Sequence, residues 1–140
     1  MNTMITYTLN DLTSRVAQLK ELMHDHRVFA FTGSLGAGKT TLIRSLLQTC
    51  GVTGIISSPT FTYVNIYQVN GKKLYHFDLY RLTSAQEFID AGFDEYLYDQ
   101  QACIFIEWPE IIASLLPKHT CFVALDYVDA GKRSLHLSFI

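Results

Sequence analysis

The chain has 140 residues, of which 49% are hydrophobic and 17% charged, a composition that fits one globular domain. We expect a single domain over residues 1–140, too short for an AAA-type ATPase with its lid or for a separate substrate domain. The net charge of −2 lacks the basic excess that phosphate contacts favour in dedicated nucleic-acid-binding proteins. Any role in RNA metabolism is therefore expected to pass through a protein partner.

Cysteine usage and the lack of long apolar segments predict a soluble cytoplasmic protein. Cys50, Cys103 and Cys121 are odd in number and lack metal-ligand spacing, so buried thiols are favoured over a metal site. The first ten residues lack the basic and apolar regions of a signal peptide, and no run of 18 apolar residues occurs.

The first half of the chain reads as helix, strand, loop and helix. Apolar residues three and four apart predict a helix over 11–26. The apolar run within 27–32 predicts a strand buried on both faces, as in the centre of a parallel sheet. A glycine-rich loop at 33–38 precedes renewed helical periodicity over 39–50, which Gly51 ends.

A β-hairpin is predicted next. Residues 61–67 alternate as a strand does, and Asn70-Gly71 favours a two-residue turn into a return strand over 74–80. A capping box that starts at Ser84 then opens a short helix.

The last part of the chain combines one more buried strand with a closing hairpin. A short helix is predicted over 93–100, and an apolar strand over 102–107 ends in an acid. Pro109 fits the first turn of a helix that reaches residue 116. Strands over 121–127 and 133–140 then form a hairpin.

The glycine-rich loop carries the most specific motif. Residues 33–40, GSLGAGKT, match G-x-x-x-x-G-K-[ST] at every fixed position, with a strand before and a helix after. Its backbone N–H groups and the helix dipole favour phosphate, Lys39 reaches the β- and γ-phosphates, and the Thr40 hydroxyl binds Mg²⁺. We therefore predict a three-layer α/β fold of the P-loop NTPase type, with a mixed, mainly parallel sheet and β-hairpins. The predicted nucleotide-binding residues of this loop are Gly33, Ser34, Leu35, Gly36, Ala37, Gly38, Lys39, Thr40 and Thr41.

Two acids compete for the carboxylate that a P-loop protein uses with Mg²⁺. Glu107 ends an apolar strand and is the stronger candidate, while Asp78 ends the return strand of the hairpin. An ordinary strand-end carboxylate is the alternative for each. Thr60 follows the P-loop helix within Ser58-Pro59-Thr60, as a hydroxyl that senses the γ-phosphate would, although a plain turn is the simpler interpretation.

Aromatic residues near these acids favour packing roles. For Trp108, the only tryptophan, core packing is favoured over a position beside the nucleotide, where its ring would report binding. Tyr63, Tyr67, Tyr75 and Tyr80 are most simply one aromatic face of the sheet.

Five sequence blocks together resemble a known family over essentially the whole chain. They are GSLGAGKTT (33–41), SPTFTYV (58–64), HFDLYRL (76–82), the stretch 87–95 with Gly92, and IEWP (106–109), followed by Leu116-Pro117. The P-loop block is generic, but the combination resembles the TsaE family, small bacterial P-loop ATPases formerly called YjeE.

The resemblance implies a role in making N6-threonylcarbamoyladenosine at position 37 of tRNAs that read ANN codons. In that family the protein binds a heterodimer of TsaB and TsaD, in which TsaD performs the carbamoyl transfer. The TsaE protein supplies an ATP-dependent step that resets the complex between turnovers, and its isolated ATPase is weak. ATP and Mg²⁺ are the implied cofactors, contact with tRNA is expected through the complex, and no membrane is involved.

The resemblance also implies roles for particular residues. Lys39 and Thr40 match the phosphate-binding lysine and the Mg²⁺ threonine, and Glu107 matches the Mg²⁺-associated glutamate. Asp78 matches an acid linked to magnesium or hydrolysis, and Thr60 matches the threonine of a switch-like segment.

Two further positions follow from the same resemblance, with two departures from it. A basic residue near the C-terminus approaches ATP in the family; Arg133 is narrowly favoured over Lys132. The stretch from Thr8 to Asp11 is expected to pack against the adenine.

Ser34 stands where the family commonly has Asp, at a variable loop position that leaves phosphate binding intact. The tail ends in the last strand and lacks any helical extension.

Three other functions stay open. A small-molecule kinase would need an acceptor site and an Arg-rich lid, for which the chain offers little room. A GTPase-like switch would carry an N-K-x-D motif, which the sequence lacks. A nucleotide-dependent interaction module that does not hydrolyse ATP would share the P-loop but not the need for Glu107.

Overall fold

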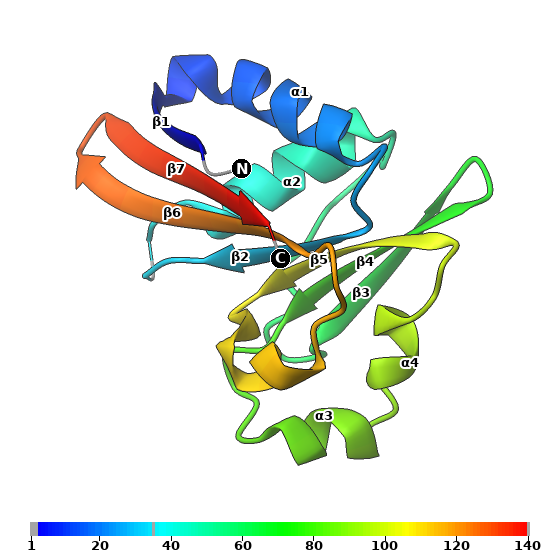
Figure 1. Ribbon diagram of the computed structural model, residues 1–140. Helices are drawn as coiled ribbons and strands as arrows, with labels where there is room; N and C mark the ends of the chain where they lie inside the picture. The colour runs from blue at the N-terminus through cyan, green and yellow to red at the C-terminus, as the bar shows by residue number, and fades with distance from the viewer. Residues whose placement is uncertain (1–2, 35, 140) are drawn as a thin grey trace.

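The computed structural model describes residues 3–34 and 36–139 and contains a seven-stranded mixed sheet with helices on both faces (Figure 1). The strands are β1 (Thr3–Thr8), β2 (Val28–Thr32), β3 (Val64–Val69), β4 (Lys72–Asp78), β5 (Ala102–Glu107), β6 (Cys121–Asp129) and β7 (Lys132–Phe139). The helices are α1 (Leu12–Leu22), α2 (Lys39–Thr49), α3 (Ala85–Asp90) and α4 (Asp94–Leu97), with 3₁₀ helices at Leu9–Asp11 and Pro109–Leu115.

The sheet has the order β1-β7-β6-β2-β5-β4-β3. Its middle pairs, β6–β2, β2–β5 and β5–β4, are parallel, whereas the pairs at the two ends are antiparallel. The predicted α/β class, with a mixed sheet and β-hairpins, is confirmed.

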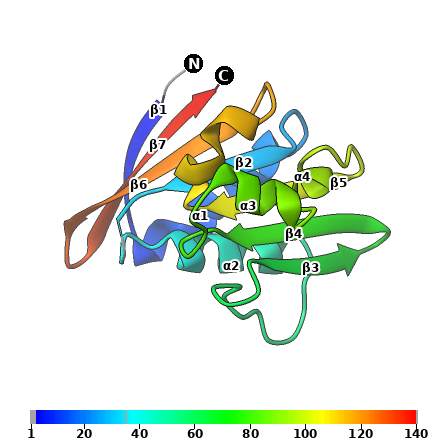
Figure 2. The same ribbon diagram turned by 90° about the horizontal axis from the view of Figure 1, so that it is seen from below.

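Each face of the sheet is covered by its own helices, which makes three layers. The helices α1 and α2 lie on one face, and α3, α4 and the 3₁₀ helix Pro109–Leu115 lie on the other (Figures 1 and 2). Side chains alternate along β2, so Phe29 and Phe31 join the core under α1 and α2 while Val28 joins the other core. Burial on both faces explains the continuous apolar run of this strand.

The two long helices attach to the sheet through apolar residues three and four apart. Val16 and Leu19 of α1 are buried, as are Leu42, Ile43 and Leu46 of α2. This spacing places them on one stripe of each helix, opposite the polar residues. The helix that follows the P-loop is therefore fixed to the sheet over its whole length.

The register brings the ends of three parallel strands to one edge of the sheet. Phe31, next to the end of β2, is aligned with Glu107 at the end of β5. Glu107 is also aligned with Asp78 at the end of β4. Because ligands of open α/β sheets bind at the carboxyl ends of the strands, the functional residues are expected here.

Several predicted boundaries shift for local reasons. The strand predicted over 61–67 begins at Val64, because the Tyr63 amide donates to the carbonyl of Pro59 (2.7 Å) and Tyr63 has a φ of 67°. Ser84 accepts the Glu87 amide, but the Glu87 carboxylate takes the amide of Thr83 rather than that of Ser84. The capping box is thus only half formed.

Two further elements are shorter or tighter than predicted. The helix predicted over 93–100 is limited to Asp94–Leu97. The segment after Pro109 is a 3₁₀ helix rather than an α-helix, with a kink at Ile112. The Asn70-Gly71 turn of the β3–β4 hairpin is confirmed, since both residues have positive φ.

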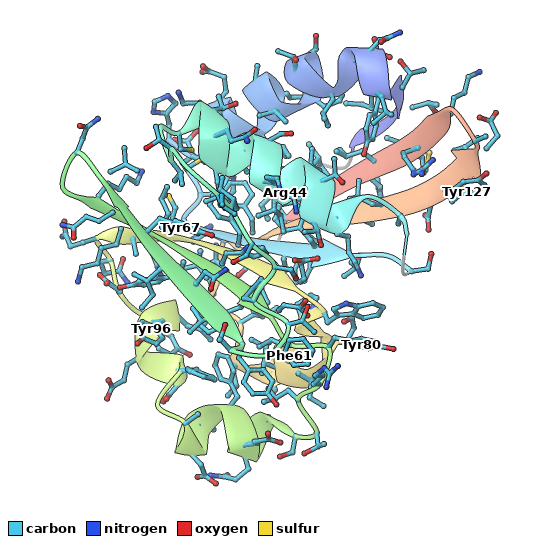
Figure 3. The ribbon with its side chains drawn as sticks, turned by 180° about the vertical axis from the view of Figure 1, so that it is seen from behind. Arg44, Phe61, Tyr67, Tyr80, Tyr96 and Tyr127 are labelled. Atoms are coloured by element: carbon cyan, nitrogen blue, oxygen red, sulfur yellow. The ribbon has the colours of Figure 1, made fainter. Side chains whose placement is uncertain are left out.

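The four tyrosines do not form one aromatic face. Tyr67 pairs with Leu74, and Tyr75 pairs with Ile66, so the two rings point to opposite sides of the hairpin. Tyr67 packs beside the core under α1 and α2 (Figure 3), whereas Tyr75 contacts Tyr96 of α4. The predicted single face is therefore wrong.

Two of the cysteines behave as the sequence predicts. Cys103 and Cys121 are buried, and Cys50 is half-buried. Burial raises the pKa of the Cys121 thiol to about 12. None of the helices within 3–34 and 36–139 is long and apolar enough to span a membrane.

Candidate functional site

The phosphate loop turns sharply because its glycines adopt conformations closed to other residues. Gly33 has a φ of 139°, and a side chain there would overlap the carbonyl oxygen of Leu125. Gly38 has a φ of 99° and caps α2, whose first hydrogen bond runs from the Leu42 amide to the Gly38 carbonyl (3.0 Å). The N-terminus of α2 therefore faces the loop, as an anion site requires.

Lys39 is held over the loop by two contacts. Its ammonium donates to the carbonyl oxygen of Gly33 and lies 3.3 Å from the centroid of the Trp108 ring. Burial lowers the pKa of Lys39, and the nearby carboxylates of Glu107, Glu110 and Asp78 oppose that change. A partly desolvated ammonium is a strong attractor for phosphate, because neighbouring water screens its charge less.

A chain of hydrogen bonds links α2, β5 and β4 through Glu107. The Thr40 hydroxyl donates to Oε1 of Glu107 at 2.7 Å, and Nε2 of His76 lies 2.7 Å from Oε2. Glu107 and His76 are both buried. The carboxylate at the end of β5 is therefore fixed through both oxygens.

Asp78 is fixed in a similar way, but by the segment after α2. The Thr60 hydroxyl donates to Oδ2 of Asp78 at 2.9 Å, and the Tyr80 amide donates to Oδ1 at 3.1 Å. The hydroxyl of Ser58 lies 2.9 Å from that of Thr60. The segment predicted as a phosphate sensor thus contacts one of the two candidate acids.

These groups surround one cavity of about 510 Å³ at the carboxyl edge of the sheet. Its lining includes nine of the predicted site residues, namely Gly36, Gly38, Lys39, Thr40, Thr41, Thr60, Asp78, Glu107 and Arg133. The structure therefore brings together the phosphate loop, both candidate acids and the candidate sensor. Their roles in binding and catalysis remain predictions.

The other predicted residues that the structure describes do not line the cavity. Ala37 is packed into the core beneath the loop, and Ser34 is exposed and accepts the Ala37 amide (3.1 Å). Thr8 and Asp11 bond to each other, with both donors of Thr8 at 3.0 Å from Oδ2 of Asp11. Leu35 lies outside the described residues.

Arg133, and not Lys132, lines the cavity. Its guanidinium lies 4.7 Å from the ring of Tyr127 and donates to the carbonyls of Asp129 and Lys132 (3.1 Å each). In β7, Arg133 pairs with Tyr7 of β1, which places both residues beside Gly38. The approach of Arg133 to ATP stays a prediction.

Sequence reasoning missed one wall of the cavity. Tyr7, Leu9 and Leu12 line it from the start of the chain, where β1 was not predicted at all. The alternation of Ile5 and Tyr7 with polar residues was a usable strand signal, but it is short and sits on an edge strand. Leu9 lies within the stretch from Thr8 to Asp11 that was expected to face the adenine.

Trp108 also lies on the cavity rather than wholly in the core. It has a left-handed backbone (φ 57°), is half-buried, and contacts Tyr80 with ring centroids 5.0 Å apart. Tyr80 and Arg81 line the cavity with it. Figure 3 shows Tyr80 and Phe61 on the same side of the molecule, and the Arg81 guanidinium lies 4.3 Å from the Phe61 ring.

The donor atoms at the cavity suit magnesium better than a transition metal. They are a hydroxyl on Thr40 and carboxylates on Glu107 and Asp78, all hard oxygen ligands. In the part of the chain that the structure describes, no group of three or more His, Cys, Asp or Glu side chains forms a metal cage. Mg²⁺ is usually held by one or two carboxylates together with phosphate oxygens, and the oxygens of Thr40, Glu107 and Asp78 would suit it.

Comparison with known proteins identifies the same family from independent data. A family model described as "Threonylcarbamoyl adenosine biosynthesis protein TsaE" matches residues 6–135. A Haemophilus influenzae protein named "tRNA threonylcarbamoyladenosine biosynthesis protein TsaE" is 45% identical over 100 residues, which cover 71% of this chain and 63% of that protein. The chain thus spans less than two thirds of that relative. The Treponema pallidum protein of the same name is 38% identical over 81% of this chain and 83% of its own length.

The fold comparison agrees. The crystal structure of Bacillus subtilis YdiB superimposes with a TM-score of 0.77 and 26% sequence identity, covering 100% of this chain and 86% of that one. The arrangement of strands and helices is therefore shared along the entire chain.

Proposed function

The chain belongs to the TsaE family of tRNA threonylcarbamoyladenosine biosynthesis proteins, and from that premise we propose that it binds and hydrolyses ATP in this pathway. The modified base is the adenosine at position 37 of tRNAs that read ANN codons. The protein acts in the cytoplasm with a TsaB–TsaD heterodimer, and TsaD performs the carbamoyl transfer. Hydrolysis of ATP resets that complex between turnovers, and tRNA is contacted through the complex.

One observation carries the ATPase part of this proposal. Lys39 and Thr40 of the phosphate loop line one cavity together with the carboxylates of Glu107 and Asp78, and the Thr40 hydroxyl bonds directly to Glu107. Phosphoryl transfer needs positioning and charge stabilisation more than covalent chemistry, and this arrangement supplies both.

Each group has a separate task in the proposed mechanism. Lys39 and the loop amides would bind the phosphates, and Thr40 and Glu107 would hold Mg²⁺. The ion would supply charge neutralisation at the β- and γ-phosphates. Asp78 accepts hydrogen bonds from the Thr60 hydroxyl and the Tyr80 amide. These bonds hold its carboxylate in the position from which it would orient the attacking water. Arg133 approaches the nucleotide from β7, and the stretch from Thr8 to Asp11 lies toward the adenine.

The segment that holds Asp78 is also suited to contact a partner. Ile55 and Phe61 flank Ser58–Thr60, and their side chains are 97% and 78% exposed. Apolar side chains this exposed are typical of protein interaction sites. Docking of the TsaB–TsaD pair on this segment would hold the existing Thr60–Asp78 hydrogen bond in place during the reaction, so the isolated ATPase is weak and the complex activates it.

We treat residues 1–140 as one ATPase domain. The two apolar cores lie on opposite faces of the same sheet, so neither can form without it.

Reconstituted tRNA modification tests this proposal. The wild-type chain or Lys39→Ala is combined with TsaB, TsaD, tRNA and a threonylcarbamoyl donor. The measured quantity is the amount of N6-threonylcarbamoyladenosine formed per complex. Repeated turnover with the wild type and a single round with the variant are expected. Equal turnover with both proteins, or phosphorylation of a nucleoside by the wild type alone, would overturn it.

A further inference from the structure

A buried histidine stands behind the cavity without lining it. His76 is 1% exposed, and its Nε2 lies 2.7 Å from Oε2 of Glu107. It does not contact the cavity that holds Lys39, Thr40 and Glu107. Any influence of this imidazole on the site therefore acts through Glu107.

The strand β4 explains how the imidazole reaches this place. His76 and Asp78 are two residues apart, so both point to the same face of the sheet. Asp78 is aligned with Glu107 on β5, and His76 is aligned with Phe105. Leu74 occupies the preceding position on this face and belongs to the apolar core. A polar ring at this point is costly to bury unless it forms a hydrogen bond.

The imidazole forms that bond with Glu107 alone. Nδ1 of His76 is buried and has no hydrogen-bond partner among the described residues. The tautomer with its proton on Nε2 donates to the carboxylate and leaves Nδ1 as an acceptor only. The polar function of the ring is thus directed entirely at Oε2 of Glu107.

The other carboxylate oxygen of Glu107, Oε1, bonds to a residue of the cavity wall. Oε1 accepts the Thr40 hydroxyl (2.7 Å), and Thr40 lines the cavity. A glutamate side chain has several rotatable bonds, and its ordering has an entropy cost. A bond to Oε2 restricts those rotations and keeps Oε1 directed at Thr40.

We propose that His76 is a positioning residue, which holds Oε2 of Glu107 so that Oε1 and the Thr40 hydroxyl are preset for Mg²⁺ that arrives with ATP. The proposal rests on the Mg²⁺–ATP site of the proposed function. Partners behind a metal-binding side chain commonly change metal affinity by about 10–100-fold when they are removed. His76 stands in this relationship to Glu107.

The test measures how far Mg²⁺ strengthens ATP binding. Calorimetry gives the ATP dissociation constant with Mg²⁺ and with a chelator, for the wild type, His76→Leu and His76→Gln. The Leu side chain removes the donor, whereas a Gln amide can replace the donor at Nε2. We expect the Mg²⁺ enhancement to fall about 10–100-fold in His76→Leu and to return largely in His76→Gln, with binding under chelator unchanged.

Two controls separate positioning from folding. His136→Leu makes the same change at a half-buried histidine on β7 and should keep the full enhancement. In a Glu107→Gln background, adding His76→Leu should cause no further loss, because the two changes act on one interaction. If His76→Leu does not fold, His76→Asn replaces it, since the shorter amide does not reach Glu107.

The outcomes distinguish this inference from the proposed function. Undiminished Mg²⁺ enhancement in His76→Leu, or an equal loss of affinity with and without Mg²⁺, would overturn the positioning role and leave the ATPase proposal standing. Absence of enhancement in the wild type would also overturn it. If the enhancement collapses in His76→Leu but the wild-type chain itself does not support tRNA modification, only the proposed function is refuted.

Discussion

The hydroxyl of Thr40 donates a hydrogen bond of 2.7 Å to Oε1 of Glu107, across 67 positions of sequence. Thr40 is the second residue of α2 and the last residue of the phosphate-loop motif, and Glu107 ends the parallel strand β5. The bond therefore joins the start of α2 to the end of β5 at the wall of the cavity. A phosphate site and a carboxylate that suits Mg²⁺ become one unit through it.

Replacement of Thr40 tests this unit. Thr40→Val keeps the side-chain shape but removes the hydroxyl, while Thr40→Ser keeps the hydroxyl. We expect Thr40→Val to lower the rate of ATP hydrolysis by about 100-fold, the size of effect seen when one preorganised polar group at a charged transition state is lost. Thr40→Ser should stay within a few-fold of the wild type. Hydrolysis by Thr40→Val at the wild-type rate would show that the hydroxyl has no part in the reaction.

The hydrogen bond between Thr60 and Asp78 gives a second prediction. Thr60→Val removes the donor at Oδ2 of Asp78. One hydrogen bond contributes about 1 kcal/mol, so kcat for ATP hydrolysis should fall about fivefold while KM changes little. Thr62→Val is the matched control, because Thr62 lies in the same exposed segment and bonds only to the carbonyl of Val64. A larger effect at Thr62 than at Thr60 would argue against a role for Thr60.

Much of this site was predictable because its signals are local. The P-loop is a contiguous motif, and Glu107 and Asp78 each end a recognisable strand. The two-residue turn at Asn70-Gly71 even fixes which residues pair across the hairpin. The opposite orientations of Tyr67 and Tyr75 follow from that pairing, so the single aromatic face was an error of reasoning rather than a missing signal.

Other parts of the site depend on contacts that no local pattern records. β1 pairs only with β7, so its role becomes visible only when the two ends of the chain are brought together. The Tyr7 side of the cavity depends on that pairing. The position of Trp108 depends on a left-handed backbone at a bulky residue, which is rare outside glycine and asparagine.

Trp108 predicts an optical signal for nucleotide binding. It is the only tryptophan, and the Lys39 ammonium lies 3.3 Å from its ring centroid. Phosphates that attract Lys39 would weaken this cation–π contact and change the emission of the ring. ATP is therefore expected to change tryptophan fluorescence, and adenosine, which lacks phosphates, is expected to change it little. Constant emission during ATP binding that calorimetry detects would contradict this contact.

Tyr75 and Asp99 predict a pH-dependent part of the stability. Tyr75 donates to Oδ2 of Asp99 at 2.7 Å, and this bond and the Gln101 amide hold the pKa of Asp99 below its ordinary 3.8. The folded chain then binds this proton less tightly than the unfolded chain does. The stabilisation is present above the ordinary pKa and is lost as the pH falls through the lower folded-state pKa.

Thermal unfolding of Tyr75→Phe measures this effect. The wild type should be more stable near neutral pH, and the difference should shrink as the pH falls below about 4. Tyr98→Phe is the control, because the Tyr98 hydroxyl donates to the carbonyl of Leu115, which does not titrate. A difference for Tyr75→Phe that is constant from neutral to acid pH would remove Asp99 as its cause.

The rate of ATP hydrolysis, with and without the TsaB–TsaD pair and tRNA, tests the central claim most directly. The chain alone should hydrolyse ATP slowly, the complete mixture should hydrolyse it several-fold faster, and Glu107→Ala should abolish both rates. A rate that the pair leaves unchanged, or full stimulation of Glu107→Ala, would contradict an ATPase that is activated in its complex and depends on Glu107.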